Sequence, residues 1–184
     1  RTAADTDKTI TVCIGRDTRG SGQMLTSAVV AGLTSLGIDT IDLGIVTTPG
    51  VGIMTRHMTC SGALVITASH NPGQYNGIKL LLSNGAAPPP ELSERIKKLY
   101  YDKDFDFVGS YDSGQLRFAE STDDIHIARI LPIVDKEKVK AGNLKVVLDS
   151  VNGTGAQVTK KLLTELGCQV VAINDEPTGI FAHP

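Results

Sequence analysis

A short stretch of the chain, from Thr67 to Lys79, gathers side chains that can bind an oxyanion or take part in group transfer. It holds the Ser69 hydroxyl, the His70 imidazole, two asparagine amides and the ammonium group of Lys79. Proline and glycine restrict or permit backbone turns within it, so the sequence predicts a shaped loop. Such a loop can hold a charged oxygen ligand such as phosphate, although the same residue types also build ordinary polar connections.

A serine hydrolase is a poor fit to these residues. The chain around Ser69 lacks the G-x-S-x-G turn that exposes a hydrolase nucleophile. Ser69 and His70 are also adjacent in the chain, so their side chains tend to diverge. The residues therefore favour phosphate chemistry, or a plain loop, over acyl transfer.

The loop follows directly on an apolar run, Ala63–Thr67, which predicts a strand buried on both faces. Thr9–Ile14 predicts another such strand, and strands alternate with helices along the chain. In open sheets of this kind, reactive groups lie in loops past the carboxyl ends of the strands. The alternation predicts an α/β fold, with a three-layer, mostly parallel sheet and helices on both faces. Further strands are expected at 39–43, 78–82, 144–149 and 169–173, and helices at 21–36, 48–57, 91–100, 121–131 and 154–166.

Several helix starts are predicted from capping residues. Ser21 is expected to cap the first helix with its hydroxyl. The pairs Ser121/Asp124 and Thr154/Gln157 have the three-residue spacing of a capping box. Each pair therefore predicts a helix that begins just after its hydroxyl residue.

Residues 102–120 lack periodicity and are rich in aspartate, glycine and serine, so they predict a linker or an irregular arm. The strand–helix pattern restarts after them. This predicts a first domain at 1–110, with the serine loop, and the start of a second, similar domain at 111–184. The second part has too few elements for an independent core, so the chain is expected to be part of a longer protein.

The composition excludes several classes of protein. Of 184 residues, 41% are apolar, and 18 basic against 20 acidic residues give a net charge of −2, so no nucleic-acid partner is expected. No apolar run approaches the ~20 residues that span a bilayer, and the polar start is no secretory signal, so no membrane partner is expected. Three cysteines, without a C-x-x-C pair, are expected to be small buried residues in a reducing cytoplasm.

The serine loop resembles a known family signature. Ala63-Leu-Val-Ile-Thr-Ala-Ser-His-Asn-Pro72, followed by Tyr75-Asn-Gly-Ile-Lys79, is similar to the active-site motif of the α-D-phosphohexomutases. That superfamily includes phosphoglucomutase, phosphomannomutase and phosphoglucosamine mutase. The resemblance extends to Gly15-Arg-Asp-Thr-Arg19, Thr47-Thr-Pro49 and Asp149-Ser-Val-Asn-Gly153, and so covers nearly the whole chain.

The resemblance implies an intramolecular phosphotransferase that moves phosphate between C1 and C6 of a hexose or hexosamine phosphate. Ser69 would carry the phosphoryl group and pass it to the sugar, giving a bisphosphate that returns its other phosphate. His70 would lie beside the transferring group, and Lys79 would act as an acid/base or stabilise charge. Mg²⁺ would be held partly through the phosphate on Ser69, and a hexose 1,6-bisphosphate would act as activator. These roles suit phosphoryl transfer, which depends on positioning and charge neutralisation.

Other residues are implied in substrate binding. Arg16, Arg19 and Asn71 are expected to hold phosphate or substrate, although a structural salt network centred on Asp17 remains an alternative for the two arginines. The turn at 152–155 could form an anion nest, but a simple capped turn is favoured. The only partner expected is a small sugar phosphate, and the protein is expected to be cytoplasmic, as a monomer or homodimer.

The family holds its metal with three aspartates in a D-G-D-x-D-R loop. Asp102-Lys-Asp-Phe-Asp106 lacks the glycine and the arginine, and is interpreted as a solvated acidic turn. The metal aspartates are expected beyond residue 184, so these residues alone are not expected to turn over. Tyr75 favours the phosphomannomutase/phosphoglucomutase branch of the family. The alternative is a non-catalytic sugar-phosphate-binding module.

Overall fold

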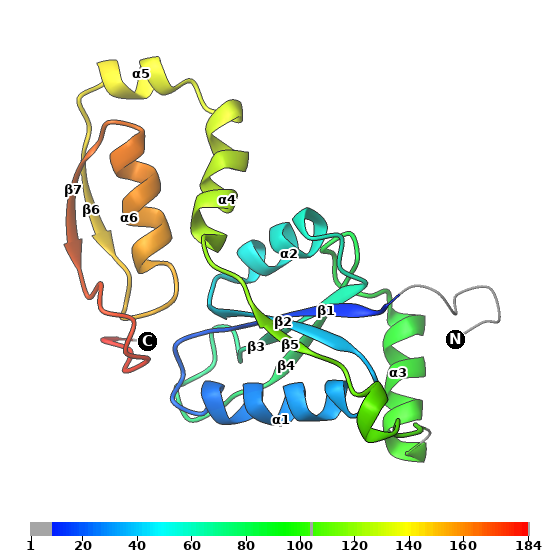
Figure 1. The fold of residues 1–184 in the computed structure, drawn as a ribbon. Helices are drawn as coiled ribbons and strands as arrows, with labels where there is room; N and C mark the ends of the chain where they lie inside the picture. The colour runs from blue at the N-terminus through cyan, green and yellow to red at the C-terminus, as the bar shows by residue number, and fades with distance from the viewer. Residues whose placement is uncertain (1–8, 104, 184) are drawn as a thin grey trace.

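The strand-forming runs of the first part of the chain assemble into one sheet, in a computed structural model that describes residues 9–103 and 105–183. The strands are β1 (Thr11–Arg16), β2 (Asp39–Ile45), β3 (Gly62–Ile66), β4 (Ile78–Leu82) and β5 (Leu116–Phe118). Their order is β4-β3-β1-β2-β5, and only β4 runs antiparallel to its neighbour (Figure 1). The prediction of a mostly parallel sheet is confirmed.

Helices cover both faces of this sheet. α1 (Gly22–Thr34) lies against one face and α2 (Thr48–His57) against the other, while α3 (Pro90–Asp102) stands beside the sheet (Figure 1). α2 has the predicted bounds, and Thr47 Oγ1 caps it by accepting a hydrogen bond from Gly50 N at 3.2 Å. The three-layer α/β architecture is therefore confirmed.

The main core lies between the sheet and α2. Cys13, Val51, Met54 and Val65 are all buried there. The thiols of Cys13 and Cys60 lie 3.2 Å apart without a disulfide, and burial raises the pKa of Cys13 well above its ordinary value. Both are small buried residues as predicted, whereas Cys168 is partly exposed.

Part of the expected linker belongs to the first sheet. β5 pairs in parallel with β2, through Thr40 opposite Leu116 and Asp42 opposite Phe118. The prediction of an irregular arm at 102–120 was therefore wrong for these residues. At least residues 116–118 of the segment 111–184 join the first sheet.

The rest of the chain forms a second, smaller α/β unit. It follows α4 (Thr122–Ile130), which packs against both α2 and α6, and its elements are α5 (Lys136–Ala141), β6 (Lys145–Asp149), α6 (Ala156–Glu165) and β7 (Gln169–Ile173). β6 and β7 pair in parallel in a separate sheet, and α6 packs beside them (Figure 1). α5 was not predicted, and short 3₁₀ turns lie at Ser110–Asp112 and Leu131–Ile133.

The three predicted hydroxyl caps were wrong. Ser121 precedes α4 with a φ of +64°, and its side chain makes no capping hydrogen bond. Gly155, not Thr154, precedes α6, and no side chain caps that helix. Ser21 accepts a hydrogen bond from Asn76 Nδ2 at 2.9 Å instead of capping α1, so it ties α1 to the serine loop.

Among the described residues, none of the helices combines the length and the apolar character needed to cross a bilayer.

Candidate active site

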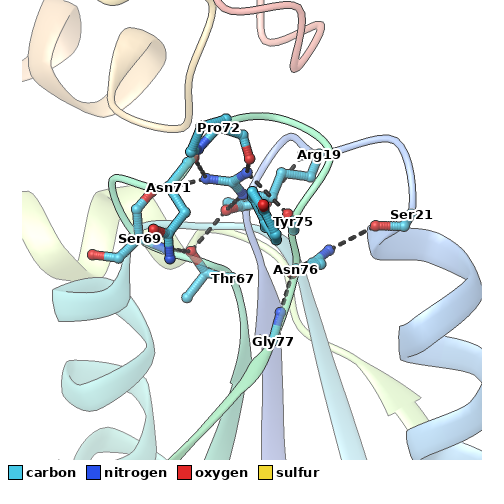
Figure 2. A network of polar contacts seen from close by, with 10 residues as sticks. Arg19, Ser21, Thr67, Ser69, Asn71, Pro72, Tyr75, Asn76 and Gly77 are labelled. Atoms are coloured by element: carbon cyan, nitrogen blue, oxygen red, sulfur yellow. Dashed lines mark hydrogen bonds and ion pairs between the residues drawn. The ribbon is translucent and has the colours of Figure 1, made fainter. Parts of the chain in front are cut away.

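The serine loop connects β3 to the antiparallel strand β4, so no helix follows it. It begins at the carboxyl end of β3, beside the loop that leaves β1. Asp17 N donates to the Ile66 carbonyl oxygen at 3.0 Å, and Thr67 N donates to that of Gly77 at 2.9 Å. The two loops therefore lie side by side at one edge of the sheet (Figure 2).

Arg19 holds the backbone of the serine loop. Its side chain is fully buried, and its Nε donates to Asp17 Oδ2 at 2.9 Å. The remaining four donors go to loop carbonyl oxygens: Pro72 (2.6 Å), Asn71 (2.7 Å), Ser69 (2.9 Å) and Tyr75 (3.0 Å). A guanidinium has five N–H donors, so none is left for a phosphate. This corrects the phosphate-binding role predicted for Arg19: the observed role is the structural alternative centred on Asp17.

Asp17 and Thr67 connect Arg19 to the Ser69 backbone through hydrogen bonds. Thr67 Oγ1 donates to Asp17 Oδ2 at 2.7 Å and accepts a hydrogen bond from Ser69 N at 2.9 Å (Figure 2). Ser69 has a φ of +57°, in the left-handed region that costs free energy for a residue with a side chain. The contacts on its N–H and its carbonyl oxygen hold Ser69 in this strained conformation.

The Ser69 hydroxyl itself is left free. Ser69 is exposed, and its Oγ has no hydrogen-bond partner among the described residues. Figure 2 shows it pointing away from the contacts that fix the loop. The site thus combines a fixed backbone with an accessible hydroxyl, which is the arrangement that a group-accepting serine needs.

Two hollows meet at Ser69, between the two units of the chain. The outer hollow, of about 610 Å³, is lined by Ser69, His70 and Asn71 together with residues after β6 and near the end of the chain. The inner hollow, of about 260 Å³, is lined by the loop after β1, by Ser69 and by the turn between β6 and α6. Both units therefore contribute to the surroundings of the serine.

Only some of the predicted site residues meet in this place. Ser69, exposed His70 and exposed Asn71 line the outer hollow together. Arg16 is the last residue of β1 and donates to Gln23 Oε1 at 3.2 Å, and exposed Lys79 lies on β4 in register with Val65. Neither lines either hollow, so their roles stay predictions.

Three residues near the serine were not predicted as site residues. Thr67 follows the strand as part of the motif, and Asp17 was considered only as the centre of a salt network. Phe181 lines both hollows, and its ring lies 5.1 Å from the Arg19 guanidinium carbon. The sequence gives no signal for Phe181, because its contact with Arg19 depends on how the two units pack.

The turn at 152–155 is occupied by internal contacts. Asn152 N donates to the Asn174 carbonyl oxygen at 2.7 Å, and Gly153 N donates to that of Ser150 at 2.7 Å. A nest formed by these two N–H groups has therefore no free donors. These two N–H groups therefore do not form an anion nest, and the structure shows no side-chain cap on the helix that follows them.

The described residues do not form a metal site by themselves. Within 9–103 and 105–183, no group of three or more histidine, cysteine, aspartate or glutamate side chains could hold a metal ion. The Asp17 carboxylate, the nearest to Ser69 in the network, already accepts from Arg19 and Thr67. Asp102 ends α3 and pairs with Lys98, and Asp104 lies outside the described residues.

This arrangement can be compared with known proteins. Residues 1–107 match domain I of the phosphoglucomutase/phosphomannomutase family, an alpha/beta/alpha domain, and residues 124–184 match its domain II. The chain belongs to the phosphoglucomutase/phosphomannomutase family. The expected resemblance is thereby confirmed.

Relatives in this family carry more than one name. A phosphoglucomutase/phosphomannomutase of Thermococcus kodakarensis is 44% identical over 170 residues, which are 92% of this chain and 37% of that protein. A phosphoglucosamine mutase of Nautilia profundicola is 37% identical over 94% of this chain and 39% of its own length. A crystal structure of a phosphoglucomutase/phosphomannomutase family protein of Burkholderia thailandensis superposes with a TM-score of 0.81 at 28% identity, over 95% of this chain and 38% of that one. The chain thus spans less than two fifths of the length of these relatives.

We expect Thr67→Val to disturb the serine loop of this family member, because valine has the shape of threonine but cannot accept the Ser69 N–H or donate to Asp17. Amide hydrogen exchange of residues 69–76 should become about tenfold faster, in line with the loss of one or two hydrogen bonds. Thr67→Ser, which keeps the hydroxyl, is the matched control and should exchange like the wild type. Equal protection in all three proteins would contradict the role of Thr67.

A second prediction concerns pH. Asp149 Oδ2 is hydrogen-bonded to His183 Nε2 at 3.0 Å, and Val151 N and Asn174 Nδ2 donate to Asp149 Oδ1. These hydrogen bonds, the one with His183 first, lower the pKa of the Asp149 carboxyl from 3.8 to about 2. A depressed carboxyl pKa contributes stability above pH 4 that is lost as the pH falls through about 2. We expect NMR titration to place the Asp149 carboxyl near 2 and His183→Ala to raise it. His57→Ala, on α2, is the control, and an unchanged titration in His183→Ala would refute the contact.

Proposed function

We propose that this chain is the N-terminal part of a phosphohexomutase, an enzyme that moves phosphate between C1 and C6 of a hexose or hexosamine phosphate. The observation that supports this most is the exposed Ser69 hydroxyl, which has no hydrogen-bond partner among residues 9–103 and 105–183. It lies on a loop whose backbone Arg19 holds through four carbonyl oxygens. Membership of the family supports the class of reaction. The free hydroxyl supports Ser69 as the residue that carries the phosphoryl group.

The proposed reaction balances without any other reactant. Phosphorylated Ser69 transfers its phosphoryl group to the free hydroxyl of a sugar monophosphate. The bond between phosphorus and Ser69 Oγ breaks and a bond to the sugar oxygen forms, while the proton of the sugar hydroxyl ends on Ser69 Oγ. The resulting bisphosphate reorients in the site and transfers its other phosphoryl group to Ser69, which restores the phosphorylated enzyme.

The remaining roles follow the position of each side chain. His70 lines the outer hollow with Ser69 and is proposed to lie beside the transferring phosphoryl group, with Asn71 as a donor to the substrate. Lys79 is proposed to act as an acid/base or to stabilise charge, and Arg16 to hold phosphate, although neither lines a hollow in this structure. Phosphoryl transfer needs such cations, because a phosphate brings about −1.5 to −2 charges.

Mg²⁺ would belong to the complete site. The phosphate on Ser69 would be one ligand, and the aspartates that complete the set are proposed to lie beyond residue 184. When bound, the ion would neutralise charge on the transferring phosphoryl group. A hexose 1,6-bisphosphate would load the serine. The 184 residues alone are therefore proposed not to turn over at a useful rate.

The proposal is tested by sugar-phosphate interconversion in the full-length protein, with Mg²⁺ and a trace of glucose 1,6-bisphosphate. Glucose 1-phosphate, mannose 1-phosphate and glucosamine 1-phosphate are supplied separately, and formation of each 6-phosphate is followed by ³¹P NMR. We expect at least one to be converted. Binding of these compounds without conversion of any would reject the mutase in favour of a non-catalytic binding module.

A further inference from the structure

A segment of the second unit, residues 178–183, lies against the loop that follows β1 (Figure 1). Gly179 makes the closest approach: a Cβ added at this position would lie 1.9 Å from the Thr18 carbonyl oxygen and 3.2 Å from the Arg19 Cα. Its φ of +73° also lies in the left-handed region, which glycine adopts without strain. Any side chain at position 179 would therefore push the segment away from the first unit.

The segment is fixed to the second unit on both sides of its phenylalanine. Gly179 N donates to the Asn152 carbonyl oxygen at 3.2 Å, and Asn152 Nδ2 donates to the Ile180 carbonyl oxygen at 2.9 Å. Further along, His183 is hydrogen-bonded to Asp149 at the end of β6. These contacts hold the aromatic residue between them in a defined position.

That residue, Phe181, covers the arginine that supports the serine loop. Its ring lies over the Arg19 guanidinium, with the guanidinium carbon 5.1 Å from the ring centroid. The Arg19 side chain is fully buried, although residues 69–75 of the loop that it holds are all exposed. A hydrogen bond is weaker where water reaches it, so the ring protects the bonds from Arg19 to the loop carbonyl oxygens.

We propose that Phe181 is a positioning residue for the reaction at Ser69: it keeps water from the hydrogen bonds of Arg19 and so holds the serine loop in one conformation. Ser69 needs this support, because its φ of +57° is strained and its carbonyl oxygen accepts from Arg19 Nη2 at 2.9 Å. The second unit thereby helps to place a serine that belongs to the first. The effect on phosphoryl transfer rests on the proposed function, whereas the effect on the loop does not.

The effect on the loop is tested by amide hydrogen exchange in the full-length protein. We expect Phe181→Ala and Gly179→Ala each to make residues 69–76 exchange about tenfold faster, because water then reaches the Arg19 donors. Phe181→Tyr, which keeps the ring, should exchange like the wild type. The matched control, Phe118→Ala, removes an exposed ring on β5 and should also exchange like the wild type. Exchange in β1 and β3 should stay unchanged in all four variants, which separates local loosening from loss of the fold.

The effect on transfer is tested by steady-state kinetics, with whichever of glucose 1-phosphate, mannose 1-phosphate and glucosamine 1-phosphate the wild type converts. We expect Phe181→Ala to lower kcat about tenfold and to leave KM within about twofold, because a misplaced reacting group slows transfer without removing a contact with substrate. Phe181→Tyr should restore kcat. A rise in KM at unchanged kcat would show that the ring contacts substrate instead, and would overturn the positioning role.

The exchange experiment decides the role of Phe181 even without a measurable activity. Unchanged exchange of residues 69–76 in Phe181→Ala, or equal acceleration in Phe181→Tyr, would overturn the proposal. A wild-type protein that converts none of the three sugar phosphates would reject the proposed function and leave the exchange result standing. The two failures are therefore distinguishable.

Discussion

Ser69→Ala in the full-length protein should lower kcat for sugar-phosphate interconversion by about 10⁴-fold or more, because it removes the oxygen that accepts the phosphoryl group. The fold should be unaffected, since the Ser69 hydroxyl makes no hydrogen bond with the described residues and the backbone contacts of residue 69 do not need it. Steady-state kinetics, with a melting curve for each protein, measure both effects.

The matched control is Ser93→Ala, which removes a hydroxyl on α3 that donates to the Pro89 carbonyl oxygen at 3.2 Å. It should keep wild-type turnover. A Ser69→Ala protein that retained more than about a hundredth of the wild-type kcat would show that the phosphoryl group is carried elsewhere, since loss of a covalent nucleophile costs far more than that.

Arg19→Met should lower the free energy of unfolding by about 3–5 kcal/mol, the cost of removing one partner of a buried ion pair. Methionine fills much of the space but leaves the Asp17 carboxylate without its cation and four loop carbonyl oxygens without donors. Urea unfolding of the variant measures this loss. We also expect the serine loop to become accessible to proteases at residues 69–75.

Arg117→Met is the control for that variant. Arg117 pairs with Asp39 at 2.7 Å, but its side chain is 61% exposed, so water can replace it at the carboxylate and the loss should be less than about 1 kcal/mol. A similar small loss in Arg19→Met would contradict the role of Arg19 as the support of the serine loop.

The elements that the sequence predicts best are those with strong local signals. α2 begins beside a proline and has its predicted bounds, and β7 follows a glycine and matches as well. β5 could not be predicted, because a three-residue exposed strand carries no pattern and exists through its pairing with β2. The helix caps failed because tertiary contacts took the hydroxyl of Ser21 and the backbone of Ser121 adopted a left-handed conformation.

In the candidate site, too, some features follow from local sequence and others depend on tertiary contacts. The motif around Ser69 predicts a loop directly after a buried strand, because the apolar run and the turn-forming residues that follow it are neighbours in the chain. The role of Arg19 could not be settled from the sequence. An arginine that binds phosphate and one that binds carbonyl oxygens are the same residue type, and only the fold brings Arg19 within 3.0 Å of four loop carbonyls. The contribution of Phe181 depends likewise on the packing of the two units.

The role of Ser69 as the phosphoryl carrier is tested most directly by mass spectrometry of the full-length protein after incubation with glucose 1,6-bisphosphate and Mg²⁺. Intact mass counts the phosphoryl groups, and peptide mapping assigns them to residues. We expect one phosphoryl group, on Ser69, which disappears when an excess of an acceptor sugar monophosphate is added. A protein that stays unmodified, or that carries the group on any other residue, would contradict this role.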